Sequence, residues 1–338
     1  MKKGALMKKT VSFIAGFLIF TALGVNAKPA EPTKSEDPIN PVKPLNIMVS
    51  ILPQVDFVER IGGDKVRVAE MIPPGFSPAT YNPSPAQLRK LQNADIYFRI
   101  GHIPFERAQM SRLQKLNTKM EVVDTSKGIE LLKLAAHHHH DDNHDHKHHK
   151  DHKKHYNHKD HDGHKEHHGH KCKKHKAGDD PHIWLSPKLV KIQAGHIFEA
   201  LVKASPQNKD YFTKNYNQLI KDLDGLDKKL TNAFKSIKGQ TILVFHPAFG
   251  YLANAYGFEQ ESIETEGKDP TPKQLQKIIG EAKKDGVKVI FVQAQFSTKS
   301  AKAVASEIGG AVVQIDPLAK DYFSNLEQMA KTIVGSFK

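Results

Sequence analysis

The sequence predicts an α/β protein with two lobes, each built on a mostly parallel β-sheet, joined by a long rigid helix. Short apolar strands alternate with amphipathic helices in two separate series, which is the pattern of βαβ units. A long helical pattern with no flanking strands separates the two series. The length of 338 residues also fits about two domains.

The first series precedes a histidine-rich stretch. Its second strand ends at Pro73-Pro74-Gly75, and its second helix has Pro85 in the first turn, where proline is favoured. The expected strands are 46–50, 66–72, 94–100 and 121–124, and the expected helices are 54–61 and 84–92.

Helical periodicity resumes at 186–203, and Ser205-Pro206 interrupts it. The next pattern, 209–235, is the predicted linking helix, because its apolar residues recur at three- and four-residue spacings. The second series then has expected strands at 241–245, 260–263, 287–292 and 311–315, and helices at 249–256, 272–284, 299–308 and 322–334. Such an architecture binds ligands at the carboxyl ends of its strands, between the lobes.

The first 27 residues are expected to be a cleaved signal peptide. Lys8-Lys9 precede an apolar run, and small residues lead to a cleavage site after Ala27. An uncleaved membrane anchor is the alternative, but the apolar run is short for a spanning helix. Residues 28–44 read as a flexible leader. The mature protein is therefore expected to be secreted into a periplasm.

The charge and cysteine content exclude two classes of protein. The formal charge is +13, with 50 Lys and Arg against 37 Asp and Glu, but no long basic run carries it. A nucleic-acid partner is therefore not expected. The single cysteine excludes a disulfide framework and a four-cysteine zinc site.

Histidine is the anomaly of the composition. Of 21 His, 17 lie between residues 137 and 175. The segment 137–176 has almost no apolar side chains, so we expect a disordered loop. Its imidazoles would capture zinc, copper, nickel or cobalt, and Cys172 would add a soft ligand. A solvated polar insertion without metal is the alternative.

Candidate metal ligands occur where predicted strands end. His246 and Asp316 follow strands directly, Gln295 comes just after another strand, and His182 lies just before a helix. Imidazole and carboxylate suit zinc, and also manganese in an oxygen-rich site. Taken singly, each residue is also compatible with a core, turn or cap role.

Together these features resemble the zinc/manganese solute-binding proteins of ABC transporters, the ZnuA/TroA type. The likeness covers residue 46 to the end and is carried by the strings DPHIWLSP (180–187), VFHPAFGY (244–251), IDPLA (315–319) and PSP (83–85). It implies two α/β lobes with a rigid linking helix and a metal between them. It places His182 and His246 on the family's second and third ligands and Asp316 on the carboxylate from the second lobe.

The resemblance also implies the domain boundaries. The N-terminal lobe is expected to be 45–208, the linking helix 209–238 and the C-terminal lobe 239–338.

The chain departs from the family at one expected ligand. Ala79 stands where the family usually has its first metal-binding histidine. His102 or Glu106 would replace it from the first lobe, with Glu106 favoured because a carboxylate helps to neutralise the cation. A loop histidine or a water is the other possibility. Glu266 is a candidate to orient a ligating histidine, although a charged loop is the simpler interpretation.

The predicted function is an extracytoplasmic receptor, not an enzyme, that acts as a monomer and delivers Zn²⁺ to an ABC transporter membrane permease. Two imidazoles favour zinc over manganese, while nickel and cobalt stay open. A metal storage or chaperone protein acting through the His-rich loop is the alternative. A secreted metallohydrolase is the third hypothesis, but the sequence has neither a His-Glu-x-x-His nor a Gly-x-Ser-x-Gly motif.

Overall fold

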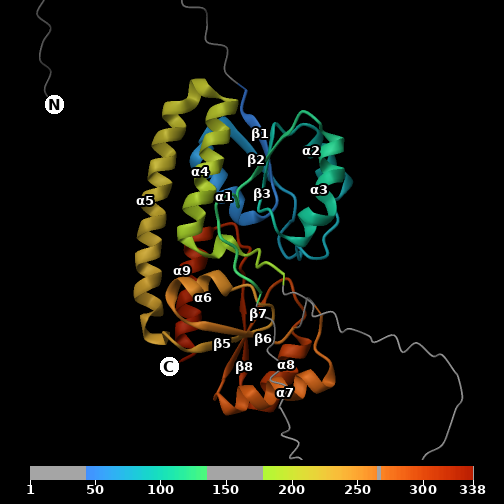
Figure 1. The fold of residues 1–338 in the computed structure, drawn as a ribbon, viewed down its shortest axis with the longest axis vertical. Coiled ribbons are helices and arrows are strands. Elements are labelled where there is room, and N and C mark those ends of the chain that lie inside the picture. The colour runs from blue at the N-terminus through green and yellow to red at the C-terminus, as the bar shows by residue number, and fades with distance from the viewer. Residues whose placement is uncertain (1–42, 135–177, 265–267, 338) are drawn as a thin grey trace, which may run out of the picture. The chain divides into compact units, whose positions relative to one another are not determined.

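The structure is a computed structural model that describes residues 43–134, 178–264 and 268–337. The predicted signal peptide, nearly all of the leader, the His-rich segment with Cys172, and Glu266 lie outside these residues. Within them, the predicted fold class is confirmed: two sheets, each of four parallel strands, are surrounded by helices (Figure 1).

The first sheet has the strand order β2-β1-β3-β4. Its strands are β1 (Leu45–Val49), β2 (Val66–Glu70), β3 (Ile96–Arg99) and β4 (Glu121–Asp124). The helices of this part are α1 (Leu52–Gly62), α2 (Pro85–Gln92), α3 (Pro104–Leu116) and α4 (Pro187–Ala204). Strand β2 lies on one side of β1, and β3 and β4 lie on the other. The carboxyl ends of β1 and β3 therefore form a topological switch point, which is where open α/β sheets bind ligands.

The second sheet repeats this topology, with the order β6-β5-β7-β8. Its strands are β5 (Thr241–Val244), β6 (Glu259–Ser262), β7 (Val289–Gln293) and β8 (Ala311–Ile315). Its helices are α6 (Gly250–Tyr256), α7 (Pro272–Lys284), α8 (Lys299–Ile308) and α9 (Tyr322–Gly335). The corresponding switch point lies between β5 and β7.

Among the described elements, helix α3 is the long one that the periodicity analysis did not predict. Ile103 and Pro104 begin it immediately after the turn that ends β3. Only four of its 13 residues are buried, namely Phe105, Glu106, Met110 and Leu113. Because one of the four is a carboxylate, the apolar periodicity over this stretch is weak.

Helix α5 (Lys209–Phe234) packs against both halves of the molecule. Its 26 residues span about 39 Å at 1.5 Å per residue. One face contacts α1 and α4 of the first part and α9 of the second. The buried residues of that face are Phe212, Leu219, Leu223, Leu226, Leu230 and Phe234. The linking helix predicted from these spacings is therefore present.

Further contacts join α1 of the first part to α9 and the turn before it. Phe57 meets Tyr322 edge to face with ring centroids 4.8 Å apart, and Arg60 lies 4.1 Å from the centre of the Phe323 ring. The Lys320 ammonium pairs with the Glu59 carboxylate at 2.9 Å. One apolar core accordingly continues from the first sheet through α5 to α9, and a smaller one fills the space between the second sheet, α7 and α8.

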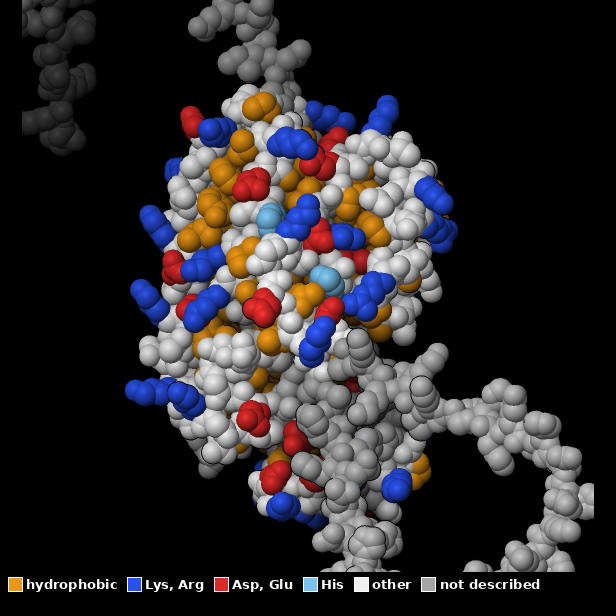
Figure 2. Space-filling view, in the orientation of Figure 1, with side chains coloured by type: hydrophobic (Ala, Val, Ile, Leu, Met, Phe, Trp, Pro, Cys, Tyr) orange, Lys and Arg blue, Asp and Glu red, His pale blue; other side chains and the backbone are white. Residues whose placement is uncertain are grey.

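The surface shows mixed charge. On the face in Figure 2, Lys and Arg side chains lie among Asp and Glu side chains with no extended area of one sign. Several are paired across helices, such as Lys191 with Asp224 at 2.7 Å and Lys229 with Glu327 at 2.7 Å. None of the described helices is both long and apolar enough to cross a membrane.

We expect Leu223→Ala to lower the free energy of unfolding by about 2–5 kcal/mol, because the side chain is fully buried where α5 meets the core. Lys228→Ala, on the exposed side of the same helix, is the control and should change it by less than about 0.5 kcal/mol. Urea unfolding followed by circular dichroism measures both. Equal effects of the two substitutions would contradict the role of this face.

Candidate metal site

His182 is held by an aspartate two residues before it. Asp180 Oδ1 accepts hydrogen bonds from the backbone N–H of His182 at 2.9 Å and from its ring Nδ1 at 2.7 Å. The aspartate is 1% exposed and the histidine 8%. A carboxylate only accepts, so Nδ1 carries the proton and Nε2 presents a lone pair.

His246 is held in the same manner from a different element. It follows β5, and its ring Nδ1 donates to Glu264 Oε1 at 2.6 Å. Gln293, at the end of β7, forms two hydrogen bonds with the backbone of His246, accepting from N at 3.2 Å and donating to O at 2.6 Å. The Phe296 ring stacks on the imidazole with centroids 4.8 Å apart. Backbone and ring are both fixed, and Nε2 again presents a lone pair.

The two imidazoles meet at these free nitrogens. Nε2 of His182 lies 3.3 Å from Nε2 of His246. Two lone pairs at this distance repel each other unless a proton or a metal ion lies between them. Two nitrogen ligands of one tetrahedral zinc, each about 2.0–2.1 Å from the ion, are about 3.3 Å apart. The geometry therefore fits a shared zinc ion.

The surroundings of His246 favour its neutral form. Burial lowers the pKa of His246, and the neighbouring His182 lowers it further, while the hydrogen bond to Glu264 opposes both effects. Only a neutral imidazole can bind a metal. The edge of Trp184 lies beside His182, with ring centroids 5.2 Å apart, and limits access by solvent.

The structure places Asp316 at the end of β8, as the sequence predicted. Its Oδ1 accepts from Gln295 Nε2 and from the backbone N–H of Leu318, each at 2.9 Å. No hydrogen bond from another described residue to its Oδ2 is found. The residue after Asp316 is linked to the residues near His182, because Trp184 Nε1 donates to Pro317 O at 2.8 Å. Gln295 therefore contacts the predicted carboxylate ligand and orients it.

Glu106 has a full set of hydrogen-bond donors. Its Oε1 accepts from Ser50 Oγ at 2.5 Å and from Ile100 N at 2.7 Å, and its Oε2 accepts from Gly101 N at 2.6 Å. The side chain is 2% exposed, and burial raises its pKa to about 7 even though the three donors act in the opposite direction. In this conformation Glu106 fixes the turn after β3.

The remaining first-lobe candidates lie on loops. His102 is half-buried and lies near Asp179, whose pKa is lowered chiefly by Lys133, with smaller contributions from His102 and Arg107. Ala79 is exposed, and its N–H donates to Ser77 Oγ at 3.2 Å. Among the described residues, no set of three or more His, Cys, Asp or Glu side chains comes together in a group that could hold a metal. The structure thus brings His182 and His246 together, but not Asp316, Glu106 or His102 with them.

The sequence reasoning missed the two carboxylates that orient the imidazoles. Asp180 stands two residues before His182, a spacing at which an aspartate side chain bonds its own turn, and this was an available signal. Glu264 follows β6, the strand beside β5, so its side chain is near the end of that strand. The residue that the sequence predicts for this role, Glu266, lies outside the described residues.

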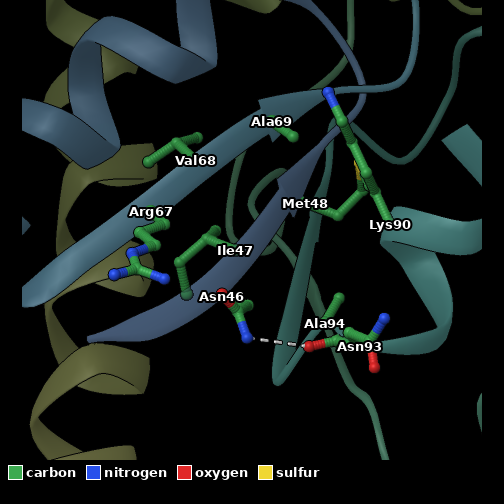
Figure 3. A pocket seen from close by; sticks show the side chains of 9 residues that line it. All are labelled: Asn46, Ile47, Met48, Arg67, Val68, Ala69, Lys90, Asn93 and Ala94. Atoms are coloured by element: carbon green, nitrogen blue, oxygen red, sulfur yellow. Dashed lines mark hydrogen bonds between the residues drawn. The ribbon is translucent and has the colours of Figure 1, made fainter. Parts of the chain in front are cut away.

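A separate groove of about 340 Å³ lies along β1 and β2 beside α2 (Figure 3). Arg67 and Lys90 are on its rim, and the Asn46 amide donates to Asn93 O at 3.1 Å within it. No predicted metal ligand lines it. It is therefore distinct from the imidazole pair.

Two parallel α/β sheets, with one imidazole at the switch point of the second sheet, a second imidazole before α4, and a buried carboxylate bonded to each, define a metal-binding protein of the solute-receptor type. The chain belongs to the family described as zinc-uptake complex component A, periplasmic, whose model matches residues 47–336. It is 30% identical over 281 residues to the high-affinity zinc uptake system protein ZnuA of Bacillus subtilis, covering 81% of this chain and 78% of that protein.

Solved structures agree with this assignment. A crystal structure of ZnuA superposes with a TM-score of 0.73 at 34% identity, covering 88% of this chain and all of that one. A 138–173 deletion mutant of ZnuA with zinc bound has the same TM-score and identity, and covers 87% of this chain and 98% of its own. The resemblance predicted from the sequence strings is confirmed.

Gly250→Ala is expected to disturb the site from the side of α6. A Cβ at Gly250 would lie 2.5 Å from Asp180 Oδ2, and Asp180 is too buried to move freely. We expect a loss of about 1–3 kcal/mol in the free energy of unfolding, the usual range for overpacking. Gly280→Ala in α7 has open space around its Cβ and should be neutral or slightly stabilising. Urea titration of both variants measures the free energies of unfolding. Equal values for the two variants would contradict the close packing of Gly250 against Asp180.

The Glu106 carboxyl is expected to make stability depend on pH. Its pKa of about 7 in the folded state lies above its usual 4.5, so its stabilising contribution is complete below pH 4.5 and is lost as the pH rises through 7. The difference corresponds to roughly 3 kcal/mol. Glu106→Gln cannot ionise, so the stability of wild type relative to this variant should fall between pH 4.5 and pH 8. Urea unfolding at several pH values measures it, and a constant difference would refute the expectation.

Proposed function

We propose that this protein is an extracytoplasmic receptor that captures Zn²⁺ and delivers it to the membrane permease of an ABC transporter. The observation that carries the proposal is the 3.3 Å separation of two imidazole Nε2 atoms whose Nδ1 atoms are each held by a buried carboxylate. The relatives named for zinc uptake support it. Export through a cleaved signal peptide and action as a monomer belong to the same proposal.

Zinc is proposed as the cargo in preference to manganese. Imidazole nitrogen suits zinc, whereas manganese prefers oxygen-rich sites. Carboxylate partners on both Nδ1 atoms make the imidazoles stronger donors and fix their orientation. The ZnuA deletion mutant with zinc bound is a solved example of zinc held by this fold.

Asp316 is proposed as the third ligand. Its Oδ1 is engaged by Gln295 and Leu318, which fixes the carboxylate and leaves Oδ2 for a cation. Glu106 is the weaker candidate because both of its carboxylate oxygens already accept hydrogen bonds. His102, a histidine of the His-rich segment and a water are the remaining candidates for the ligand that Ala79 cannot supply.

The receptor and storage hypotheses differ in what removal of the His-rich segment does. Leu134 N donates to Gly178 O at 2.9 Å, so the residues flanking the segment are adjacent and 137–176 can be deleted without stretching the fold. We expect one tight zinc site in the shortened protein by titration calorimetry. If it binds no zinc tightly, the receptor site proposed here is wrong and storage by the His-rich segment becomes the better account.

Each imidazole is expected to be essential for that site. His182→Ala or His246→Ala should weaken zinc binding by more than about 100-fold, since loss of an orienting partner alone costs 10- to 100-fold. His196→Ala is the matched control, because the hydrogen bond of this ring among the described residues is to the backbone oxygen of Lys127, at 2.9 Å. In the same titrations, Asp316→Asn, His102→Ala and Glu106→Gln identify the third ligand. A control variant that weakens binding as much as His182→Ala would contradict the assignment.

A further inference from the structure

Two segments of chain run antiparallel beside the imidazole pair, residues 129–134 and 178–182, and together we call them the strap. Lys133 pairs with Asp179 in an antiparallel bridge. Asp180 N donates to Leu132 O at 2.8 Å, and Leu134 N donates to Gly178 O at 2.9 Å. Asp180, which holds His182, is therefore a member of this short ladder.

A side chain from the second part of the molecule is inserted into the ladder. In an antiparallel pair the two opposed residues exchange two N–H···O bonds. Leu132 and Asp180 make one of these directly, but the other passes through Tyr251: Leu132 N donates to the Tyr251 hydroxyl at 3.0 Å, and that hydroxyl donates to Asp180 O at 3.0 Å. The hydroxyl takes the place of a direct backbone bond.

The same short segment of chain carries His246. Residues 246–251 run from this histidine into α6, and the turn between them is closed by the bond from Ala248 N to His246 O at 2.8 Å. At the other end of the segment, Gly250 packs against the Asp180 carboxylate, and the Tyr251 hydroxyl donates to the backbone oxygen of Asp180. One short segment therefore carries His246 and also contacts Asp180, the residue that orients His182.

We propose that Tyr251 is a positioning residue of the zinc site, and that its hydroxyl fixes Asp180 so that Nε2 of His182 faces Nε2 of His246. The inference rests on the proposed zinc-binding function. Asp180 bonds both the backbone and the ring of His182, so a shift of Asp180 moves the imidazole. Burial raises the pKa of Tyr251 to about 12, and the hydroxyl keeps its proton for Asp180 O at neutral pH.

The test compares Tyr251→Phe with Tyr256→Phe in the full chain. Both tyrosines are buried on α6, but the Tyr256 hydroxyl bonds Asp227 of α5 at 2.9 Å and does not touch the strap. In the metal-free protein, Tyr251→Phe should speed hydrogen exchange of the Leu132 amide by about threefold to tenfold, the worth of one hydrogen bond. Tyr256→Phe should leave that amide unchanged.

Metal binding supplies the second readout. Zinc affinity is measured by competition with a chelator, and the ligand geometry by the visible spectrum of Co²⁺, with the His182→Ala/His246→Ala double variant as the baseline for all other sites. Tyr251→Phe should bind zinc about 10- to 100-fold more weakly and shift the Co²⁺ bands. Tyr256→Phe should match the wild type in both.

The inference fails if Tyr251→Phe keeps the wild-type affinity and Co²⁺ spectrum, or if Tyr256→Phe loses as much. Those outcomes leave the zinc receptor itself intact, since the wild type still binds above the baseline. A wild type that binds no more zinc than the double variant overturns the proposed function, and the positioning role with it.

Discussion

The site depends on the hydrogen bonds between buried carboxylates and the Nδ1 atoms of two histidines. Asp180 and Glu264 fix the tautomer of each ring, and the consequence is that two nitrogen lone pairs face each other. An empty site is therefore electrostatically unfavourable, and a cation relieves the repulsion. Both carboxylates also lie one imidazole ring away from the point where the two nitrogens meet, a position at which carboxylates favour a bound cation.

The repeated topology places these groups. In each sheet, the chain adds its second strand on one side of the first strand and its third strand on the other side. The carboxyl ends of β1 and β3, and those of β5 and β7, therefore lie at switch points. His246 and Gln293 come from the second of these, and the Glu106 network with Ser50 and Ile100 from the first. Within the described residues, the two switch points differ in function. The one in the second sheet presents the imidazole of His246, whereas at the one in the first sheet the Glu106 carboxylate accepts hydrogen bonds from the turn after β3.

Much of the fold followed from local sequence signals. Helices α7 and α8 begin and end at the predicted residues because Thr271 with Gln274 forms a capping box and Gly309 ends α8 in the left-handed conformation. Helix α3 was missed because its buried face includes a carboxylate. The strings predict His182, His246 and Asp316 as ligands, and the structure brings the two histidines together. The contact of Glu264 with His246 could not be predicted, because it depends on how β5 and β6 are paired.

Helix α5 constrains how a cargo ion enters and leaves. A single apolar face of α5 packs against α1, α4 and α9, so one continuous helix contacts both halves of the molecule. Separating the two sheets would expose the buried leucines of α5 to water. A small rotation of one sheet about α5 would not. A change in the angle between the sheets about α5 would therefore keep this apolar face buried and would not require any helix or strand to unfold.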